Sequence, residues 1–282
     1  MPFETLAPRL QAVATSALAL CRQRFGQNGL KTESEIHPTI PWRPTFFVKQ
    51  SRYKLIAVEI DDNIYPEILK IAAHDIGHHD FPIAVYQGCS LEAYQLDTKH
   101  TKVNLLKRHG FGLITVDDAG HCVIQHAAVP LAQHISPEDV ERELSGLTPT
   151  VKVAFRSAHD TYLVNEGQGL QQAGQIVEGL VRSLAIQAEK EGLMAIGKLP
   201  LATIVDHLWA LPKFAKHRAA LGGTREFVSD FRNVASHPAN SAKAAAEKIR
   251  KCKAGFLDAM KFARKLREVA QEVGYRITIY VT

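Results

Sequence analysis

The sequence changes pattern near residue 136, and this change constrains the fold more than any other feature. Before it, short apolar runs rich in β-branched and aromatic residues alternate with helical stretches; after it, the pattern is helical. Strands that alternate with helices are typical of an α/β domain. The segment 136–139 fits a helix start, with a capping Ser, a Pro in the first turn and acidic residues at the positive end of the helix dipole. We therefore predict two domains, residues 1–135 and 136–282.

The expected fold is a mixed central sheet flanked by helices, followed by an all-α bundle. Strands are expected over 45–48, 54–60, 82–86, 112–116 and 122–127. Helices are expected over 5–25, 66–74 and 99–109 in the first domain, and over 169–190, 201–211 and 241–273 in the second. Trp209 and Phe214, at the end of one helical stretch, are expected in the core.

Charge is divided unevenly between the two halves. Residues 1–159 carry a net charge of −1 and residues 160–282 one of +6. Basic side chains that lie along one helix can track the phosphates of a nucleic acid, although such runs also occur on solvated helix faces. The residues concerned are Lys243, Lys248, Arg250, Lys251, Lys253, Lys261, Arg264, Lys265 and Arg267.

Other bulk features point to a cytoplasmic protein with no membrane segment. No apolar run reaches spanning length, and the first thirty residues lack a secretory pattern. The four cysteines are scattered, which argues against a zinc site and against a disulfide framework. We expect them to be small buried apolar residues.

The stretch 230–238 places Arg232, Asn233 and His237 at the end of a predicted helix. Cleavage of RNA through its own 2′-hydroxyl needs a group that titrates near neutral pH and a fixed cation for the charge on the phosphorane oxygens. Positions five apart are offset by about 140° on a straight helix. Because a residue before proline avoids helical dihedrals, Pro238 should let His237 swing toward the face that carries Arg232.

This arrangement resembles the R-x(4–6)-H signature of HEPN domains, in which a polar residue, often Asn, follows the Arg. The resemblance implies a four- or five-helix bundle, a homodimer, RNA as substrate and an antitoxin or sensor as a further partner. It also implies a role in stress response, toxin systems or phage defence, with no cofactor and no metal. Glu178, on the first long helix, would be a supporting residue that orients Arg232. Asp230 is a second supporting candidate, although two residues before Arg232 it points elsewhere.

The first domain resembles the restriction-endonuclease-like, or PD-(D/E)xK, fold. In active members an Asp and an acid-x-Lys pair bind a divalent metal. Here Thr45 stands in place of the Asp, and Glu59 with Asp61 stands in place of Glu-x-Lys. Loss of one carboxylate and of the Lys removes a metal ligand and the cation near the attacked phosphate, so we expect a degenerate site that binds a ligand or docks a partner.

Two alternatives stay open. His74 and Asp75 resemble the doublet of HD phosphohydrolases, with His37 as a further ligand and Asp97 or Asp117 as the last, which would make the first half a metal-dependent nuclease or phosphohydrolase. The strands predicted on both sides disagree with the all-helical HD fold. The second alternative is a non-catalytic helical module for dimerisation or RNA binding.

Overall fold

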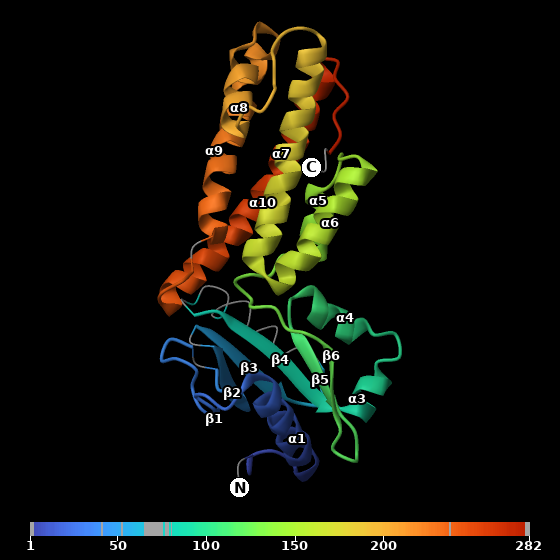
Figure 1. The fold of residues 1–282 in the computed structure, drawn as a ribbon. Coiled ribbons are helices and arrows are strands. Elements are labelled where there is room, and N and C mark those ends of the chain that lie inside the picture. Colours follow the sequence, from blue (N-terminus) through green and yellow to red (C-terminus); the bar gives the residue numbers. More distant parts are fainter. Residues whose placement is uncertain are drawn as a thin grey trace. The chain divides into compact units, whose positions relative to one another are not determined.

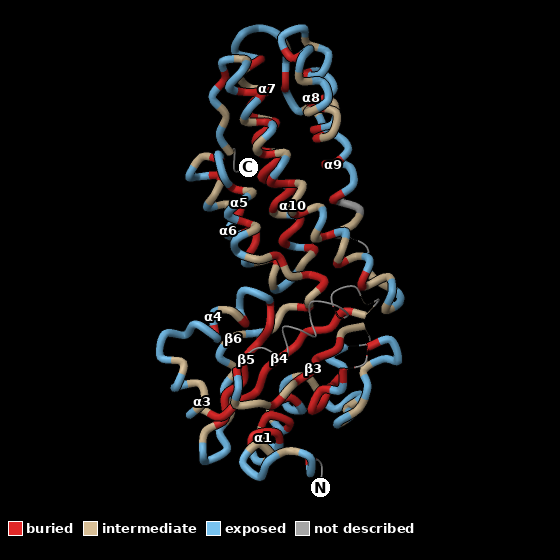
Figure 2. Tube along the Cα trace, turned by 180° about the vertical axis from the view of Figure 1, so that it is seen from behind, coloured by how far each residue is buried: buried red, intermediate tan, exposed pale blue. Residues whose placement is uncertain are grey.

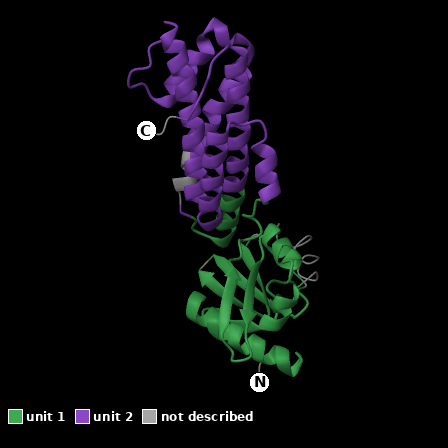
Figure 3. Cartoon of the chain, turned by 90° about the vertical axis from the view of Figure 1, so that its right-hand side faces the viewer, with its two compact units in different colours: residues 1–136, 239–250 green, residues 137–238, 251–282 purple. Residues whose placement is uncertain are grey.

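The computed structural model describes residues 3–40, 42–51, 53–64, 76, 79, 81–236 and 238–279, without the side chains at 232, 233, 235 and 236. The chain divides into two compact units (Figure 3). Unit 1 comprises residues 1–136 and 239–250, and unit 2 comprises residues 137–238 and 251–282. Among the described residues, no helix has both the length and the apolar character needed to cross a membrane.

Unit 1 is built on a mixed sheet of six strands in the order β1-β2-β3-β4-β5-β6 (Figure 1). The central strands β3, β4 and β5 are parallel, and the pairs β1-β2, β2-β3 and β5-β6 are antiparallel. The α/β expectation is confirmed at this level. The strands are β1 (Lys31–Thr32), β2 (Phe46–Ser51), β3 (Lys54–Ile60), β4 (Ile83–Ser90), β5 (Gly112–Val116) and β6 (Cys122–His126).

One face of the sheet is covered by α1 (Pro8–Phe25). The helix has Pro in its first turn, and Gly26 follows it with a φ of 89°, a left-handed conformation that favours glycine. Its buried residues recur with helical periodicity and pack on Phe46, Val58 and Ile114 of the sheet. They are Val13, Ala14, Ala17, Leu18 and Cys21.

The other face packs against α3 (Leu91–Leu96) and α4 (Thr101–Arg108). Buried residues follow β3, β4 and β5 in Figure 2, and every residue of β4 and β5 is buried. Burial on both faces is typical of central parallel strands. The expected strand 82–86 is therefore too short, because β4 continues to Ser90 through a polar but buried segment.

Unit 2 is helical, as the sequence indicates. Long helices lie side by side in Figure 1, and tight contacts hold them together. A Cβ at Gly169 of α7 would lie 2.3 Å from the Tyr162 Cα of α6, so only glycine fits there. The elements are α5 (Pro137–Glu143), α6 (Pro149–Val164), α7 (Glu166–Lys190), α8 (Leu201–Ala210), the 3-10 turn η2 (Pro212–His217), α9 (Arg218–Ser236) and α10 (Ala242–Glu272), whose residues 242–250 belong to unit 1.

Several side chains depart from expectation. Phe214 is fully buried, but the core assignment of Trp209 is wrong, because this side chain is 45% exposed. Cys21, Cys89 and Cys252 are buried as expected, whereas Cys122 is only partly buried. The helix expected over 66–74 lies outside the described residues.

Candidate functional site

The segment that was predicted to cleave RNA begins in the last turns of α9. The helix ends at Ser236, so the backbone of Arg232 and Asn233 is helical and His237 follows directly. The side chains of these three residues lie outside the description, and their mutual geometry stays a prediction. The last turns of α9 contact the neighbouring helices α7 and α10.

Phe231, the residue before Arg232, anchors this end of the helix. It is 4% exposed, and its ring stacks on that of Phe227 with centroids 5.3 Å apart. On the opposing helix α7, a Cβ at Gly174 would lie 2.4 Å from the Phe231 ring. The glycine thus leaves the space that the ring occupies, and the backbone that carries Arg232 is fixed by a buried neighbour.

The two supporting residues lie in different surroundings. Glu178 is half-buried on α7, one turn after Gly174 and therefore on the same face of that helix. This is the face that packs against α9, which agrees with the expected role but leaves the contact with Arg232 untested. Asp230 is exposed and lines a groove between α9 and α10.

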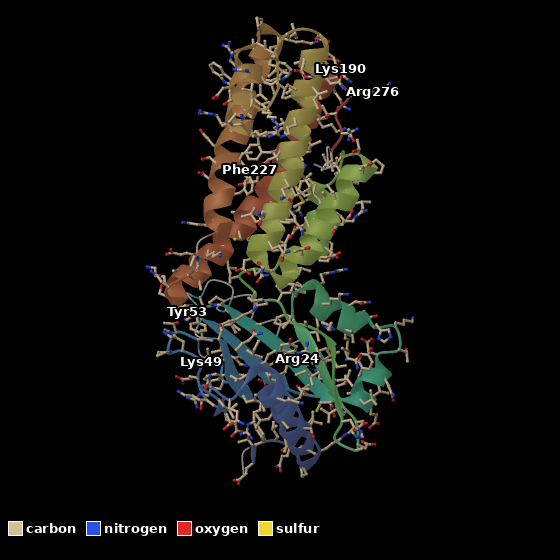
Figure 4. All side chains as sticks on the ribbon, in the orientation of Figure 1. Arg24, Lys49, Tyr53, Lys190, Phe227 and Arg276 are labelled. Atoms are coloured by element: carbon tan, nitrogen blue, oxygen red, sulfur yellow. The ribbon has the colours of Figure 1, made fainter. Side chains whose placement is uncertain are left out.

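This groove has a volume of about 550 Å³ and an acidic rim. Exposed Glu226 and Asp230 on α9 face Asp258 and Lys251 on α10, while the rings of Phe227 and Phe262, 5.4 Å apart, contribute to its lining. Figure 4 labels Phe227 on α9. Three carboxylates and one ammonium disfavour a phosphate backbone. The groove lining comprises Leu170, Gly223, Glu226, Phe227, Asp230, Phe231, Val234, Lys251, Ala254, Gly255, Asp258 and Phe262.

The basic residues of α10 are less available than the sequence suggests. Lys261 pairs with Asp258 at 3.1 Å, and Arg264 pairs with Glu143 at 3.3 Å. Burial lowers the pKa of Lys253. In unit 1, Arg250 donates a hydrogen bond to the His79 carbonyl at 2.9 Å. A continuous phosphate-tracking face along this helix is therefore not supported.

In unit 1 the residues of the expected degenerate site lie together. The Thr45 backbone N–H donates to Glu59 Oε2 at 3.2 Å, and the Ile60 N–H donates to Thr45 Oγ1 at 3.0 Å. Thr45 is 5% exposed, so its hydroxyl serves the strand pairing of β2 and β3. At the position expected to correspond to a metal ligand, this chain has a buried hydroxyl that is already engaged with the backbone.

Glu59 is the unusual group of this site. Burial raises its pKa to about 7, although hydrogen bonds from the Thr45 backbone and the Trp42 side chain oppose the shift, and nearby Asp61 adds to it. A carboxyl that is half-protonated near neutral pH is a poor ligand for a divalent cation. The Trp42 contact gives no signal in the sequence, because it joins residues that the fold alone brings together.

The neighbouring acids are also engaged. Asp61 Oδ1 accepts from the Asn63 N–H at 2.9 Å, and Asp62 Oδ1 accepts from the Ser90 N–H at 2.8 Å. Arg9 of α1 lies 3.8 Å from Asp62 and is also bonded to Glu92. Within the described parts of the chain, no group of three or more His, Cys, Asp or Glu residues is placed to hold a metal ion.

The HD alternative receives little support from its described members. His74 and Asp75 lie outside the described residues. The Asp97 carboxylate caps α4 by accepting from the backbone of Thr101, Lys102 and Val103, and Asp117 is bonded to His121. The ring of His37 packs edge-on against that of His79, with centroids 4.6 Å apart.

Sequence reasoning missed one exposed aromatic side chain, Trp209. Its ring is covered on one side by the guanidinium of Arg218, with Cζ 4.6 Å from the ring centroid. In the sequence, the basic residues that follow Trp209 were the only indication that its ring is exposed.

Comparison of the chain with protein-family models, with curated proteins and with solved structures found no match.

Proposed function

We propose that unit 2 is a metal-independent endoribonuclease of the HEPN type that acts in a stress, toxin or phage-defence system. The observation that carries the proposal is the position of the motif. Arg232 and Asn233 lie close to the end of a helix that stops one residue before His237 and Pro238, and buried Phe231 holds that end in place. A bundle of long helices around it is consistent with the same family.

The proposed chemistry needs no group beyond the protein and the RNA. The 2′-hydroxyl gives up its proton as its oxygen attacks the phosphorus, the bond to the 5′-oxygen breaks, and the leaving 5′-oxygen receives a proton. His237 would move the proton, Arg232 would stabilise the phosphorane oxygens and Asn233 would position the phosphate. The products are a 2′,3′-cyclic phosphate and a 5′-hydroxyl.

The active unit would be a homodimer. One Arg–His pair is a sparse site, and a two-fold interface brings two copies of the same surface together. The substrate should approach the motif away from the groove between α9 and α10, because the carboxylates of Glu226, Asp230 and Asp258 would repel its phosphates. An antitoxin or sensor protein is the expected further partner.

Unit 1 would not be the nuclease. Thr45 offers no carboxylate, and Glu59 has a pKa of about 7 because it is buried. We infer that this unit has a restriction-endonuclease-like fold with a degenerate site that binds a ligand or docks a partner. Neither role calls for a metal.

The test is RNA cleavage by the full chain in the presence of EDTA. Activity should persist, and it should vanish when the attacking 2′-hydroxyl is replaced by hydrogen. His237→Ala and Arg232→Ala should each lower the rate at least about a hundredfold, because general acid–base work contributes about 10²–10⁴-fold and a lost phosphorane contact about 10²–10³-fold. His207→Ala and Arg225→Ala are matched controls, since both residues are exposed and lie outside the motif.

Two results would redirect the proposal. Wild-type cleavage by a folded His237→Ala variant would favour a non-catalytic dimerisation or RNA-binding module. Activity that chelator abolishes and Mg²⁺ restores would favour a metal-dependent site in unit 1.

A further inference from the structure

Trp209, the penultimate residue of α8, has an aromatic ring that is unusually exposed for its size. The side chain is 45% exposed. Arg218, the first residue of α9, lies over the ring with Cζ 4.6 Å from the centroid, and its Nε donates to the Trp209 carbonyl at 3.3 Å. The guanidinium therefore holds the ring in one orientation and places a fixed positive charge beside it.

The turn between Trp209 and Arg218 is anchored by a buried aromatic contact. Phe214 of η2 is fully buried, and its ring centroid lies 6.1 Å from that of Tyr275. Lys216 is exposed but lines a pocket with Glu268 and Glu272 of α10, whose carboxylates offset its charge. Lys213 is held by Glu191 at 2.6 Å and so contributes less charge. Arg218 is therefore the cation that this turn presents beside the indole.

We propose that Trp209 and Arg218 form a binding site for single-stranded RNA, in which a base stacks on the exposed indole and the guanidinium binds a flanking phosphate. Aromatic rings interleaved with cations are the means by which proteins bind single strands without reading their sequence. A duplex keeps its bases stacked within the helix and cannot use the indole in this way. The proposal deepens the ribonuclease function, on which it rests, by naming single strands as the substrate class.

The distance between this site and the motif sets a minimum length for an RNA that occupies both. Arg218 and Arg232 are fourteen residues apart on α9, a distance of about 21 Å at about 1.5 Å per residue. A strand with bases stacked at about 3.4 Å needs about six nucleotides to cover that distance. Shorter oligonucleotides can occupy the stacking site or the motif, but not both.

The two tryptophans make the test direct, since the chain has only Trp42 and Trp209, and Trp42 is 9% exposed. Intrinsic fluorescence would be recorded while a twelve-nucleotide oligouridylate is added to the full-length His237→Ala protein, which removes cleavage from the measurement. We expect quenching that saturates. In parallel, fluorescence anisotropy of a labelled copy of the same oligonucleotide gives the Kd for variants that lack the indole.

Trp209→Ala should raise this Kd about 5- to 150-fold, and Trp209→Phe should restore most of the affinity because it keeps a ring. Arg218→Ala should weaken binding as well. Arg156→Ala is the matched control, because it removes an exposed, acid-paired cation that lies on α6 and not on the path along α9, and it should change the Kd little. The melting temperature of each variant shows that the fold is kept.

Each outcome separates this proposal from the function on which it rests. An unchanged Kd in Trp209→Ala, or equal affinity for duplex and single strand, would overturn the stacking site even if chelator-resistant cleavage persists. Tight, Trp209-dependent binding without any cleavage by the wild type would keep the stacking site and refute the ribonuclease.

Discussion

Replacing Gly174 with Ala should loosen the end of α9 that carries the motif, and the structure sets the size of the effect. The new Cβ would lie 2.4 Å from the Phe231 ring, whereas carbon atoms in good contact are about 3.5–4.0 Å apart. The ring must move by more than about 1 Å, yet it is buried against Phe227. Overpacking of this kind costs about 1–3 kcal/mol.

Gly222→Ala isolates this steric cost. Gly222 lies inside α9, and nothing lies within 4 Å of the Cβ that it would gain. Both substitutions gain the same helix propensity, about 1 kcal/mol, so this contribution cancels when the two variants are compared. The difference in the free energy of unfolding between them should therefore be about 1–3 kcal/mol, with Gly174→Ala the less stable.

The measurement is urea unfolding of the full chain followed by far-UV circular dichroism. RNA cleavage under the same conditions should fall in Gly174→Ala and stay at the wild-type rate in Gly222→Ala, because only the former displaces the residue before Arg232. Equal stability of the two variants would refute the tight seating of Phe231. Equal stability together with equal cleavage would show that this contact does not position the motif.

The remaining predictions concern unit 1. Because burial raises the pKa of Glu59 from 4.5 to about 7, the stability that its protonated form contributes is complete below pH 4.5 and is lost as pH rises through 7. Between pH 4.5 and pH 7, the free energy of unfolding of Glu59→Gln should rise relative to that of the wild type by up to about 3 kcal/mol. Urea unfolding at a series of pH values measures this difference. A difference that does not change with pH would contradict the raised pKa. Plasmid nicking by the full chain with Mg²⁺ or Mn²⁺ should not be detectable; nicking that disappears in Glu59→Ala would mean that the site is active. A thiol reagent should label Cys122 first in the native protein, because the other three cysteines are buried. Mass spectrometry that finds Cys21 and Cys89 labelled as fast as Cys122 would contradict the packing around the sheet.

The strands were predictable where local pattern and burial agree. The runs 54–60 and 112–116 match β3 and β5 in full, because β-branched apolar residues fill them and turn residues bound them. The end of β4 was not predictable, because Gln87 and Ser90 are polar residues that the fold nevertheless buries, with only 2% and 4% of their surface exposed. Gln87 donates to the carbonyls of Asp61 and Asn63, and such partners exist only in the folded sheet.

In the helical half, too, a buried polar residue hides an element from prediction. The helix predicted over 169–190 corresponds to α7, whereas α6 was not anticipated, because the polar residue His159 interrupts its apolar side. His159 is nevertheless 7% exposed. For the candidate sites, the sequence identifies residue types at a helix end and along a hairpin. It cannot show that Trp42 bonds to Glu59 or that the Trp209 ring faces solvent, since both depend on packing between distant segments.

The return of residues 239–250 to unit 1 means that the two units cannot be separated by breaking one peptide bond. A fragment that stops at residue 136 lacks Asn240, whose carbonyl accepts from the Tyr53 hydroxyl, and Arg250, which donates to the His79 carbonyl. A protease that cuts once between the units would therefore release an incomplete first unit, with the missing twelve-residue piece still attached to the helices. A gene rearrangement that replaced the helical unit would have to keep residues 239–250 and join new sequence on both sides of them. The two units should therefore be inherited together.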